Sequence, residues 1–294
     1  MALHPQARAA VEAYADEQPV DDPSFDLDAS RSAARTLAAS DAREPVAHVA
    51  GLDAGGVDCR LYRPEGADGL VVHLHGGGFV FHDLETHDAA ARRLANRTGM
   101  AVLSVGYRCA PEHPFPAARN DVDTVLQWLA DEAPGLGLDG PAYVHGDSAG
   151  GNLALVAALR HPGRFAAVAL LYPFLDPSGS FDSYRTAADG FDAREAAWYW
   201  DQYADAGQRT DPDVAPLLSD RLGTLPPTLV VTAEHDPLRD EGEELVRRLA
   251  EEGVTVVGTR YLGQVHGFWR QPELFDAAEP ATRQVAAFLR QHRG

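Results

Sequence analysis

The sequence predicts an α/β fold with a mostly parallel sheet of eight strands and helices on both faces of that sheet. Short, continuously apolar runs alternate along the chain with stretches of helical periodicity. Strands that are apolar throughout are typical of parallel sheets, which helices cover on both sides. A Gly-x-Ser-x-Gly motif and a run of three glycines each follow one of these apolar runs, so we expect the sheet to position the chemically active residues.

The individual elements follow from polarity and spacing. Residues 46–52 and 57–62 alternate in polarity around the turn at residues 54–56, which predicts an antiparallel hairpin. Six more strands are predicted at residues 70–74, 101–105, 142–145, 166–171, 228–232 and 255–261. Helical spacing predicts helices at residues 86–97, 117–130, 149–159, 240–252 and 279–290.

Two segments do not fit this alternation. Residues 1–45 predict a helical leader, with helical spacing at residues 7–15 and 32–39 and an acidic, proline-containing loop between them. Residues from 176 to about 225 are rich in aromatic side chains but show no strand pattern, and residues 193–203 have helical spacing. We expect this insert to pack over the carboxyl edge of the sheet, where open α/β sheets bind their ligands.

Composition narrows the classes of partner. The formal net charge of −19 predicts a surface that repels phosphate backbones and anionic lipids, so we expect no nucleic-acid or membrane partner. No apolar stretch approaches the roughly 18 residues of a membrane helix, and the first residues lack the pattern of a signal peptide. Cys59 and Cys109 form neither a disulfide framework nor a zinc site. The cytoplasm is the expected location.

The candidate nucleophile is Ser148, at the centre of the motif Gly146-Asp147-Ser148-Ala149-Gly150. The motif alone is weak evidence, but here it joins an apolar strand to a good helix. A sharp turn between strand and helix raises the serine hydroxyl above the sheet, and small neighbours avoid clashes in that turn. The alternative, a serine that only caps the helix, is the weaker interpretation.

A candidate oxyanion hole follows the strand at residues 70–74. Acyl transfer places negative charge on a carbonyl oxygen, which preplaced N–H donors must stabilise. In the run His75-Gly76-Gly77-Gly78 the glycines expose their backbone N–H groups, so we expect Gly77, Gly78 and Ala149 to be the donors. The run does not have the spacing of a dinucleotide fingerprint or the lysine of a phosphate-binding loop. We expect His75 to fix the loop through a backbone hydrogen bond.

Chain order selects the partners of the serine. Serine hydrolases built on such sheets place the nucleophile, the acid and the histidine in that order, on loops after successive strands. Asp236 and His266 each follow a late strand, so both fall at the same sheet edge as Ser148. His266 would accept the serine proton, and Asp236 would orient His266 and stabilise its charged form. We expect Asp240 and Glu241 to begin a helix instead, and His235 to point elsewhere.

Together these blocks resemble the hormone-sensitive-lipase-like family of bacterial esterases, also called family IV. The resemblance runs from about Val71 to the C-terminus. Its matching blocks are His75-Gly76-Gly77-Gly78, Tyr107-Arg108-Cys109-Ala110-Pro111-Glu112, Gly146-Asp147-Ser148-Ala149-Gly150, Asp236-Pro237-Leu238-Arg239-Asp240-Glu241-Gly242 and His266-Gly267-Phe268. Cys109 departs from the family pattern, which commonly has Leu there, and we interpret it as a small apolar substitute.

The resemblance implies an α/β-hydrolase fold with a helical cap, built from residues 1–45 and an insertion at about 177–215 of a catalytic domain spanning 46–294. It implies a serine carboxylesterase that hydrolyses short-to-medium acyl esters through an acyl-serine intermediate, without metal or cofactor. A homodimer is a further expectation, because many relatives are dimers. Tyr107, Arg108 and Glu112 would support the fold, and Asp147 the surroundings of the serine.

The substrate is less well defined by the sequence. We expect Phe79, Phe81 and Phe268 to line an apolar pocket for a small ester, and the aromatic residues 198–200 to be mainly core. An amidase, a deacetylase or a carbamate hydrolase would use the same triad. An acyltransferase and a non-catalytic small-molecule-binding protein are further alternatives, although the intact Ser148, Asp236 and His266 argue against the latter.

Overall fold

A computed structural model describes residues 2–132, 134–136, 138 and 140–293 of the chain, so Met1 and Gly294, the outer ends of the predicted segments, lie outside the described residues. Within the described ranges, a single sheet contains eight strands. They are β1 (His48–Asp53), β2 (Asp58–Arg63), β3 (Leu70–Leu74), β4 (Ala101–Val105), β5 (Ala142–Asp147), β6 (Ala167–Leu171), β7 (Thr228–His235) and β8 (Val256–Val265).

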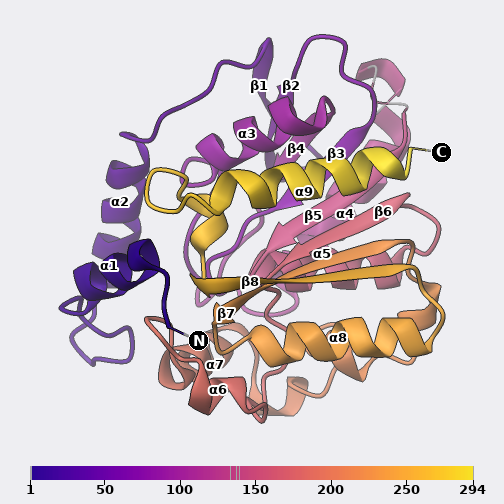
Figure 1. The fold of residues 1–294 in the computed structure, drawn as a ribbon. Helices are drawn as coiled ribbons and strands as arrows, with labels where there is room; N and C mark the ends of the chain where they lie inside the picture. Colours follow the sequence, from indigo (N-terminus) through magenta and orange to yellow (C-terminus); the bar gives the residue numbers. More distant parts are fainter. Residues whose placement is uncertain (1, 133, 137, 139, 294) are drawn as a thin grey trace.

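The sheet is mostly parallel, as the sequence predicts. The strands lie in the order β1-β2-β4-β3-β5-β6-β7-β8 (Figure 1). β2 pairs antiparallel with β1 and with β4, and all the later pairs are parallel. The carboxyl ends of six strands therefore meet at one edge of the sheet, and the loops that follow them are brought together there.

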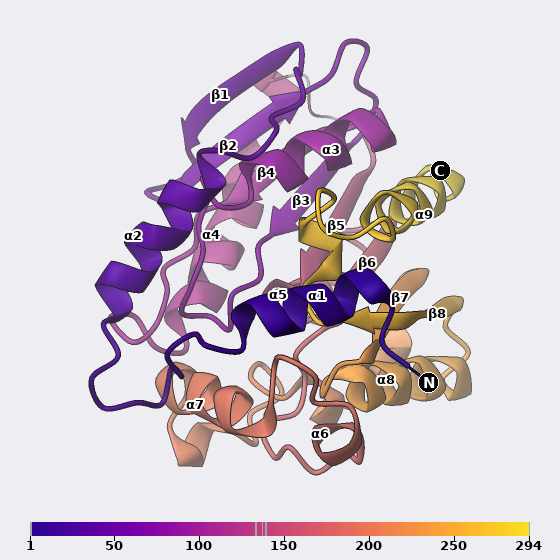
Figure 2. The same ribbon diagram turned by 60° about the vertical axis from the view of Figure 1, so that its left-hand side comes forward.

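Helices cover both faces of this sheet (Figures 1 and 2). They are α1 (Pro5–Tyr14), α2 (Leu27–Ala38), α3 (Asp88–Thr98), α4 (Ala117–Glu132), α5 (Ala149–Arg160), α6 (Ser183–Thr186), α7 (Ala193–Tyr203), α8 (Arg239–Glu251) and α9 (Ala278–Gln291). Buried side chains of α3 and α9 pack on one face, and those of α4, α5 and α8 pack on the other. None of the helices in the described ranges is long and apolar enough to cross a membrane.

The inner strands need continuous apolar runs because each of them faces two cores. Successive side chains of a strand point to opposite faces. Val71 accordingly packs with α3 and α9, whereas its neighbour Val72 packs with the α4, α5 and α8 side. All five residues of β3 are buried. This is why β3 is a nearly continuous apolar run and not an alternating one.

The leader and the insert lie together at one end of the molecule. α1 and α2 lie near α7 in Figure 2, and the ring of Phe25, just before α2, is 6.3 Å from the ring of Trp198 on α7. Arg194 of α7 also forms an ion pair with Asp21 of the leader. α2 begins at Leu27, five residues before the predicted helix, because the Asp26 carboxylate accepts a hydrogen bond from the Ala29 N–H and caps it.

Two glycines around the motif at the end of β5 have no room for a side chain. A Cβ on Gly146 would lie 2.1 Å from the Gly150 carbonyl oxygen, and a Cβ on Gly150 would lie 2.0 Å from the Leu74 carbonyl oxygen. Both obstacles are backbone atoms of the central strands and helix, which cannot move aside cheaply. The turn between β5 and α5 is therefore packed directly against β3.

We predict that Gly150→Ala lowers the free energy of unfolding by about 1–3 kcal/mol or more, because overpacking displaces backbone. Urea unfolding followed by circular dichroism measures this change. Gly51→Ala is the matched control, because a Cβ on Gly51 would meet nothing within 4 Å. Equal urea midpoints for Gly150→Ala and the wild type would show that the turn is not packed as described.

Candidate active site

The turn between β5 and α5 holds Ser148 in an unusual conformation. Its φ is 52° and its ψ is −122°, a backbone conformation that residues other than glycine rarely adopt. The Ser148 N–H donates to the Leu171 carbonyl on β6, and the Ser148 carbonyl accepts from the Phe174 N–H. These bonds on both sides of the residue hold the strained backbone, so that the hydroxyl stands above the sheet edge.

The three predicted partners lie in one hydrogen-bonded chain. His266 Nε2 is 3.0 Å from Ser148 Oγ, and His266 Nδ1 is 2.8 Å from Asp236 Oδ2. Asp236 directly follows β7 and His266 directly follows β8, so neighbouring strands bring them to the edge where β5 delivers the serine. The other carboxylate oxygen of Asp236 accepts from the Leu238 N–H at 2.9 Å. In this arrangement Ser148 donates to His266, and His266 donates to Asp236.

Two aromatic rings pack against His266. The ring of Tyr172 is 4.7 Å from it and the ring of Phe191 is 4.9 Å away, centroid to centroid. Burial by itself lowers the pKa of His266, but the charge and hydrogen bond of Asp236 outweigh burial, so the net pKa is raised. Asp147 and Glu195 add to the increase. The raised pKa makes the neutral His266 imidazole a better acceptor for the serine proton, as a general base requires.

The glycine run forms a tight turn beside the serine. The Gly77 carbonyl accepts hydrogen bonds from the N–H groups of Val80 and Phe81, and Gly77 and Gly78 have φ values of 121° and 59°. In the described chain no acceptor pairs with the N–H of Gly77 or Gly78. Ala149 begins α5, so its N–H has no partner within the helix. All three N–H groups are available to an oxygen bound next to Ser148.

Neighbouring side chains fix the start of this turn. His75 Nδ1 lies 2.9 Å from the Gly76 carbonyl, which matches the loop-fixing bond expected of His75. The Tyr107 hydroxyl donates to the His75 carbonyl at 2.6 Å, and the ring of Tyr107 stacks on the imidazole. The Gly76 N–H donates to the carboxylate of Asp147. Asp147, the residue before Ser148, therefore ties the end of β5 to the glycine turn.

A cavity of about 150 Å³ opens next to Ser148. Apart from Ser148 and His266, its walls are Gly77, Gly78, His82, Asp147, Tyr172, Phe174, Phe191, Glu195, Tyr199, Gly267 and Arg270. Four of these residues are aromatic and come from the loop after β6 or from the insert around α7. The insert thus forms one wall of the cavity.

The predicted pocket residues Phe79, Phe81 and Phe268 are not among the described residues that line this cavity, and this part of the prediction is corrected. Phe79 is fully buried, and its ring stacks at 3.7 Å on Tyr203. Phe268 is also fully buried, and Phe81 packs against the leader and α7. All three phenylalanines are close in sequence to residues of the site, but their side chains are buried in the surrounding packing.

Sequence reasoning missed several polar residues of the cavity wall, among them Glu195, Tyr199 and Arg270. The Tyr199 hydroxyl donates to Glu195 at 3.0 Å, and burial raises the pKa of Glu195. Arg270 Nη1 lies 3.4 Å from His82 Nδ1. Glu195 and Tyr199 are four residues apart and share a face of α7, which the sequence could have revealed. The expectation that residues 198–200 are mainly core holds for the buried Trp200 but not for Tyr199.

The other candidate acids and histidines lie elsewhere. His235 Nδ1 is 2.7 Å from Asp189 of the insert, so it points away from Ser148. Asp240 and Glu241 lie in the first turn of α8, as predicted, and accept from the Ser183 and Leu175 N–H groups. Among the described residues, no group of three or more histidine, cysteine or acidic side chains is placed to hold a metal ion.

Several known proteins with related sequences are named as ester hydrolases. A carboxylic ester hydrolase of Mycobacterium tuberculosis, LipN, is 38% identical over 256 residues, which is 81% of this chain and 68% of that protein. An ethyl acetate hydrolase of Pseudomonas putida is 35% identical over 247 residues, covering 79% and 78%. An arylesterase of Saccharolobus solfataricus is 36% identical over 242 residues, with the same shares covered.

Solved structures and a family model agree with these relatives. A hyperthermophilic esterase from the archaeon Pyrobaculum calidifontis has a TM-score of 0.92 and 36% identity, and 99% of each chain is covered. The carboxylesterase EstE1, cloned from a metagenomic library, has a TM-score of 0.87 at 36% identity, covering 93% of this chain and 99% of EstE1. A family model described as the α/β-hydrolase fold matches residues 71–270. The chain therefore belongs to the hormone-sensitive-lipase-like family, family IV, of esterases with the α/β-hydrolase fold.

Proposed function

We propose that this chain is a serine carboxylesterase that hydrolyses short-to-medium acyl esters through an acyl-serine intermediate. The observation that carries the proposal is the hydrogen-bonded chain from Ser148 through His266 to Asp236, next to the free N–H groups of Gly77 and Gly78. Nucleophile, base, orienting carboxylate and oxyanion donors are the four components that acyl transfer requires. The ester-hydrolysing relatives support the same reaction.

In the first half-reaction, Ser148 Oγ attacks the ester carbonyl carbon while its proton passes to His266 Nε2. The carbonyl oxygen becomes negative and accepts hydrogen bonds from the N–H groups of Gly77, Gly78 and Ala149. When the tetrahedral intermediate collapses, the bond to the alcohol oxygen breaks and His266 returns the proton to the departing alcohol. Asp236 stabilises the charged imidazole between these two steps.

In the second half-reaction water takes the place of the alcohol. His266 removes a proton from the water as its oxygen attacks the acyl carbon, and the same N–H groups receive the negative charge. Collapse then breaks the bond to Ser148 Oγ, which regains the proton from His266. The products are a carboxylic acid and the free enzyme, and the chain's own residues make every proton transfer.

The size and lining of the cavity favour a small, mostly apolar acyl group. A volume of about 150 Å³ accommodates a group the size of benzene. Tyr172, Phe174 and Phe191 supply apolar surface, while Glu195 and Arg270 place charged groups at the wall.

We propose that the helices of residues 1–45 and the insertion at about 177–215 act as a cap over this cavity. The cytoplasm remains the proposed location, and Cys59 and Cys109 are both free thiols.

We predict that p-nitrophenyl acetate and butyrate are hydrolysed faster than the octanoate, and the palmitate slowest, because long chains exceed the cavity. Release of p-nitrophenol measures these rates. Ser148→Ala should reduce kcat by about 10⁶-fold. Faster cleavage of the palmitate would contradict the cavity argument. Failure of the folded protein to hydrolyse any ester would contradict the esterase proposal and favour an amidase, a carbamate hydrolase or an acyltransferase.

We predict that kcat/KM falls as the pH drops through the raised pKa of His266, because only the neutral imidazole can accept the serine proton. The acid limb should therefore lie above pH 6.5, the ordinary value. Asp236→Asn removes the charge that raises this pKa, so it should shift the limb to lower pH and reduce kcat about 10⁴-fold. A wild-type limb below pH 6.5, or an unshifted limb in Asp236→Asn, would contradict this assignment.

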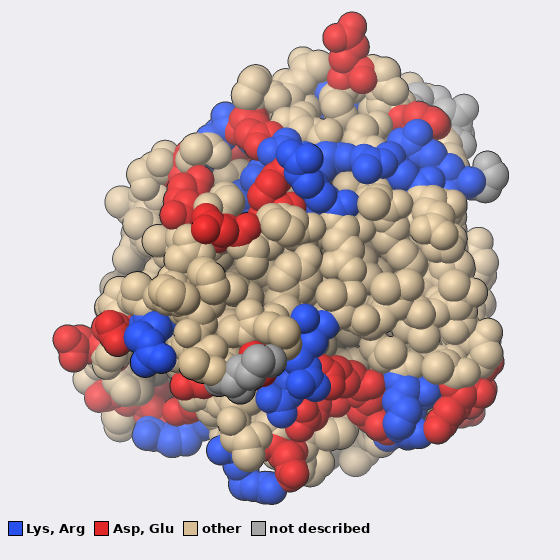
Figure 3. Space-filling view, in the orientation of Figure 1, with Lys and Arg blue, Asp and Glu red and all other residues tan. Residues whose placement is uncertain are grey.

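We also infer a homodimer that forms through the edge strand β8. In the described sheet β8 pairs with β7 alone, and Val257 and Leu262 are 41% and 57% exposed. In Figure 3 the surface between α9 and α8, where β8 runs in Figure 1, shows a broad band without charged side chains. Unpaired strand edges and apolar patches are common sites of self-association.

We predict a solution mass twice that of the 31.6 kDa chain, measured by light scattering after size exclusion. Val257→Lys should give the single-chain mass, because it places a charge in the strand edge. Leu37→Lys serves as the control, since Leu37 is 66% exposed on α2 and is not part of β8. A wild-type protein with the single-chain mass at micromolar concentration would exclude this dimer.

A further inference from the structure

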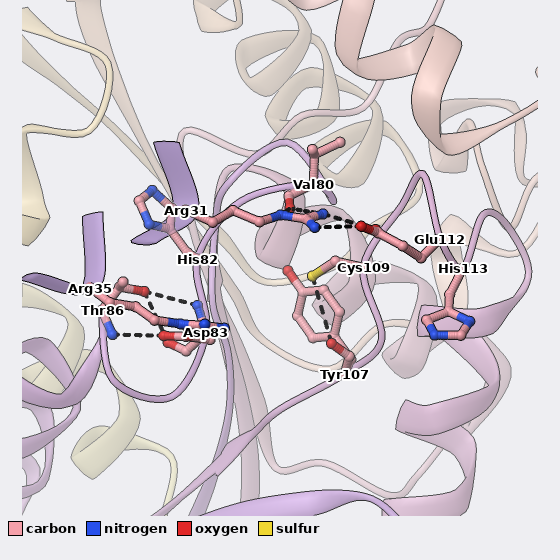
Figure 4. A pocket seen from close by; sticks show the side chains of 10 residues that line it. All are labelled: Arg31, Arg35, Val80, His82, Asp83, Thr86, Tyr107, Cys109, Glu112 and His113. Atoms are coloured by element: carbon pink, nitrogen blue, oxygen red, sulfur yellow. Dashed lines mark hydrogen bonds and ion pairs between the residues drawn. The ribbon is translucent and has the colours of Figure 1, made fainter. Parts of the chain in front are cut away.

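One arginine of the leader, Arg31, hydrogen-bonds to the end of the glycine turn. Arg31 lies on α2 and extends over the loop after β3, where it lines a second cavity of about 300 Å³ (Figure 4). This outer cavity lies between α2, residues 80–86 and the loop after β4. His82 lines both the outer cavity and the cavity beside Ser148, so the two are separated only by the turn and its continuation.

The Arg31 guanidinium binds the backbone at the end of the turn. Its Nε and Nη2 donate to the Val80 carbonyl at 3.0 and 2.8 Å, and Nη2 also donates to the Ala110 carbonyl at 2.7 Å. The preceding carbonyl, that of Phe79, accepts from the Ala110 N–H at 2.9 Å. Both carbonyl groups that follow Gly78 are therefore fixed from outside the turn.

Glu112 holds Arg31 in this position from the other side. Its two carboxylate oxygens accept from Nη1 and Nη2 of Arg31 at 2.7 and 3.0 Å, a two-point contact that sets the plane of the guanidinium (Figure 4). The Arg31 side chain is only 18% exposed, whereas Glu112 is 50% exposed. A partly buried guanidinium in such a fork has little freedom to leave the Val80 carbonyl.

The turn depends on the position of Val80. The N–H of Val80 closes the turn by donating to the Gly77 carbonyl, and Gly77 and Gly78 supply two of the proposed oxyanion donors. Donors of this kind work only when they are preplaced within a few tenths of an ångström. A shift of the Val80 peptide would therefore rotate the peptides that carry these N–H groups.

We propose that Arg31 is a positioning residue: together with Glu112 it couples docking of α2 to the geometry of the oxyanion turn. This inference rests on the proposed esterase function. It means that the leader completes the catalytic geometry as well as covering the cavity. Arg31 touches neither the substrate nor the reacting atoms, and it acts through the carbonyl groups of Val80 and Ala110.

A neighbouring arginine of the same helix provides a matched control. Arg35 lies one turn further along α2 and pairs with Asp83, beyond the turn. Its side chain is 60% exposed, so the pair contributes little net stability. Arg35→Met removes a docking contact of α2 but leaves the bonds to Val80 and Ala110 intact.

The test compares Arg31→Met with Arg35→Met and the wild type, using p-nitrophenyl butyrate and an alkyl trifluoromethyl ketone. The ketone adds to the serine and places a negative oxygen in the oxyanion hole, so its inhibition constant reports that geometry. We expect Arg31→Met to lower kcat about 10- to 100-fold and to weaken inhibition by the same factor, with KM nearly unchanged. Arg35→Met should change each constant by less than about twofold.

Two further measurements keep the proposal testable if Arg31→Met does not fold. Arg31→Lys retains the charge but donates from a single point, so it cannot serve Val80, Ala110 and Glu112 together and should lower kcat in the same direction. In Arg31→Ala, ethylguanidinium can enter the enlarged outer cavity, and it should restore a fraction of kcat. Methylammonium should restore much less.

The outcomes separate this proposal from the proposed function. Ser148-dependent turnover with kcat and ketone inhibition unchanged in Arg31→Met or Arg31→Lys would overturn the positioning role and leave the esterase intact. Equal losses in Arg31→Met and Arg35→Met would also overturn it, because they would indicate general loosening of α2. Absence of Ser148-dependent turnover in the wild type would overturn both proposals.

Discussion

The backbone at Ser148 adopts a conformation that the surrounding structure must impose. Its positive φ persists because the N–H is bonded to β6, the carbonyl is bonded to Phe174, and Gly146 and Gly150 allow strand, turn and helix to touch. The same contacts tie the turn to β3, from which the glycine run emerges. Nucleophile and oxyanion donors therefore share one rigid support, and the parallel register of the strands sets the distance between them.

The sequence predicts best those features that depend on residues close together in the chain, such as the limits of the central strands. β3 and β4 coincide with their predicted limits, since each is a nearly continuous apolar run with clear ends. The observed eight-stranded sheet confirms the fold class and the strand number, and its cover on both faces explains the apolar runs. Chain order selects Ser148, Asp236 and His266, and the structure places them within hydrogen-bonding distance of one another. The catalytic role assigned to them remains a prediction.

What the sequence could not supply depends on the packing of distant segments. β7 and β8 extend to His235 and Val265, beyond their predicted ends, because pairing around an irregularity continues through residues that are not strongly apolar. The three phenylalanines predicted for the pocket are core, since closeness in sequence to a catalytic residue does not fix the direction of a side chain. Which face of α7 lines the cavity beside Ser148 is likewise set by docking of the insert and not by helical spacing.

The contact between Gly78 and Tyr199 restricts how such a site can change over time. A Cβ on residue 78 would lie 2.2 Å from the Tyr199 ring, so the ring occupies the space of any side chain there. Residue 199 must therefore become smaller before residue 78 can gain a side chain, and the reverse order passes through a blocked intermediate. The φ of 59° would then favour asparagine over most other newcomers. Substitutions in the pocket wall and in the glycine turn are thus coupled, and the order in which they can occur is fixed.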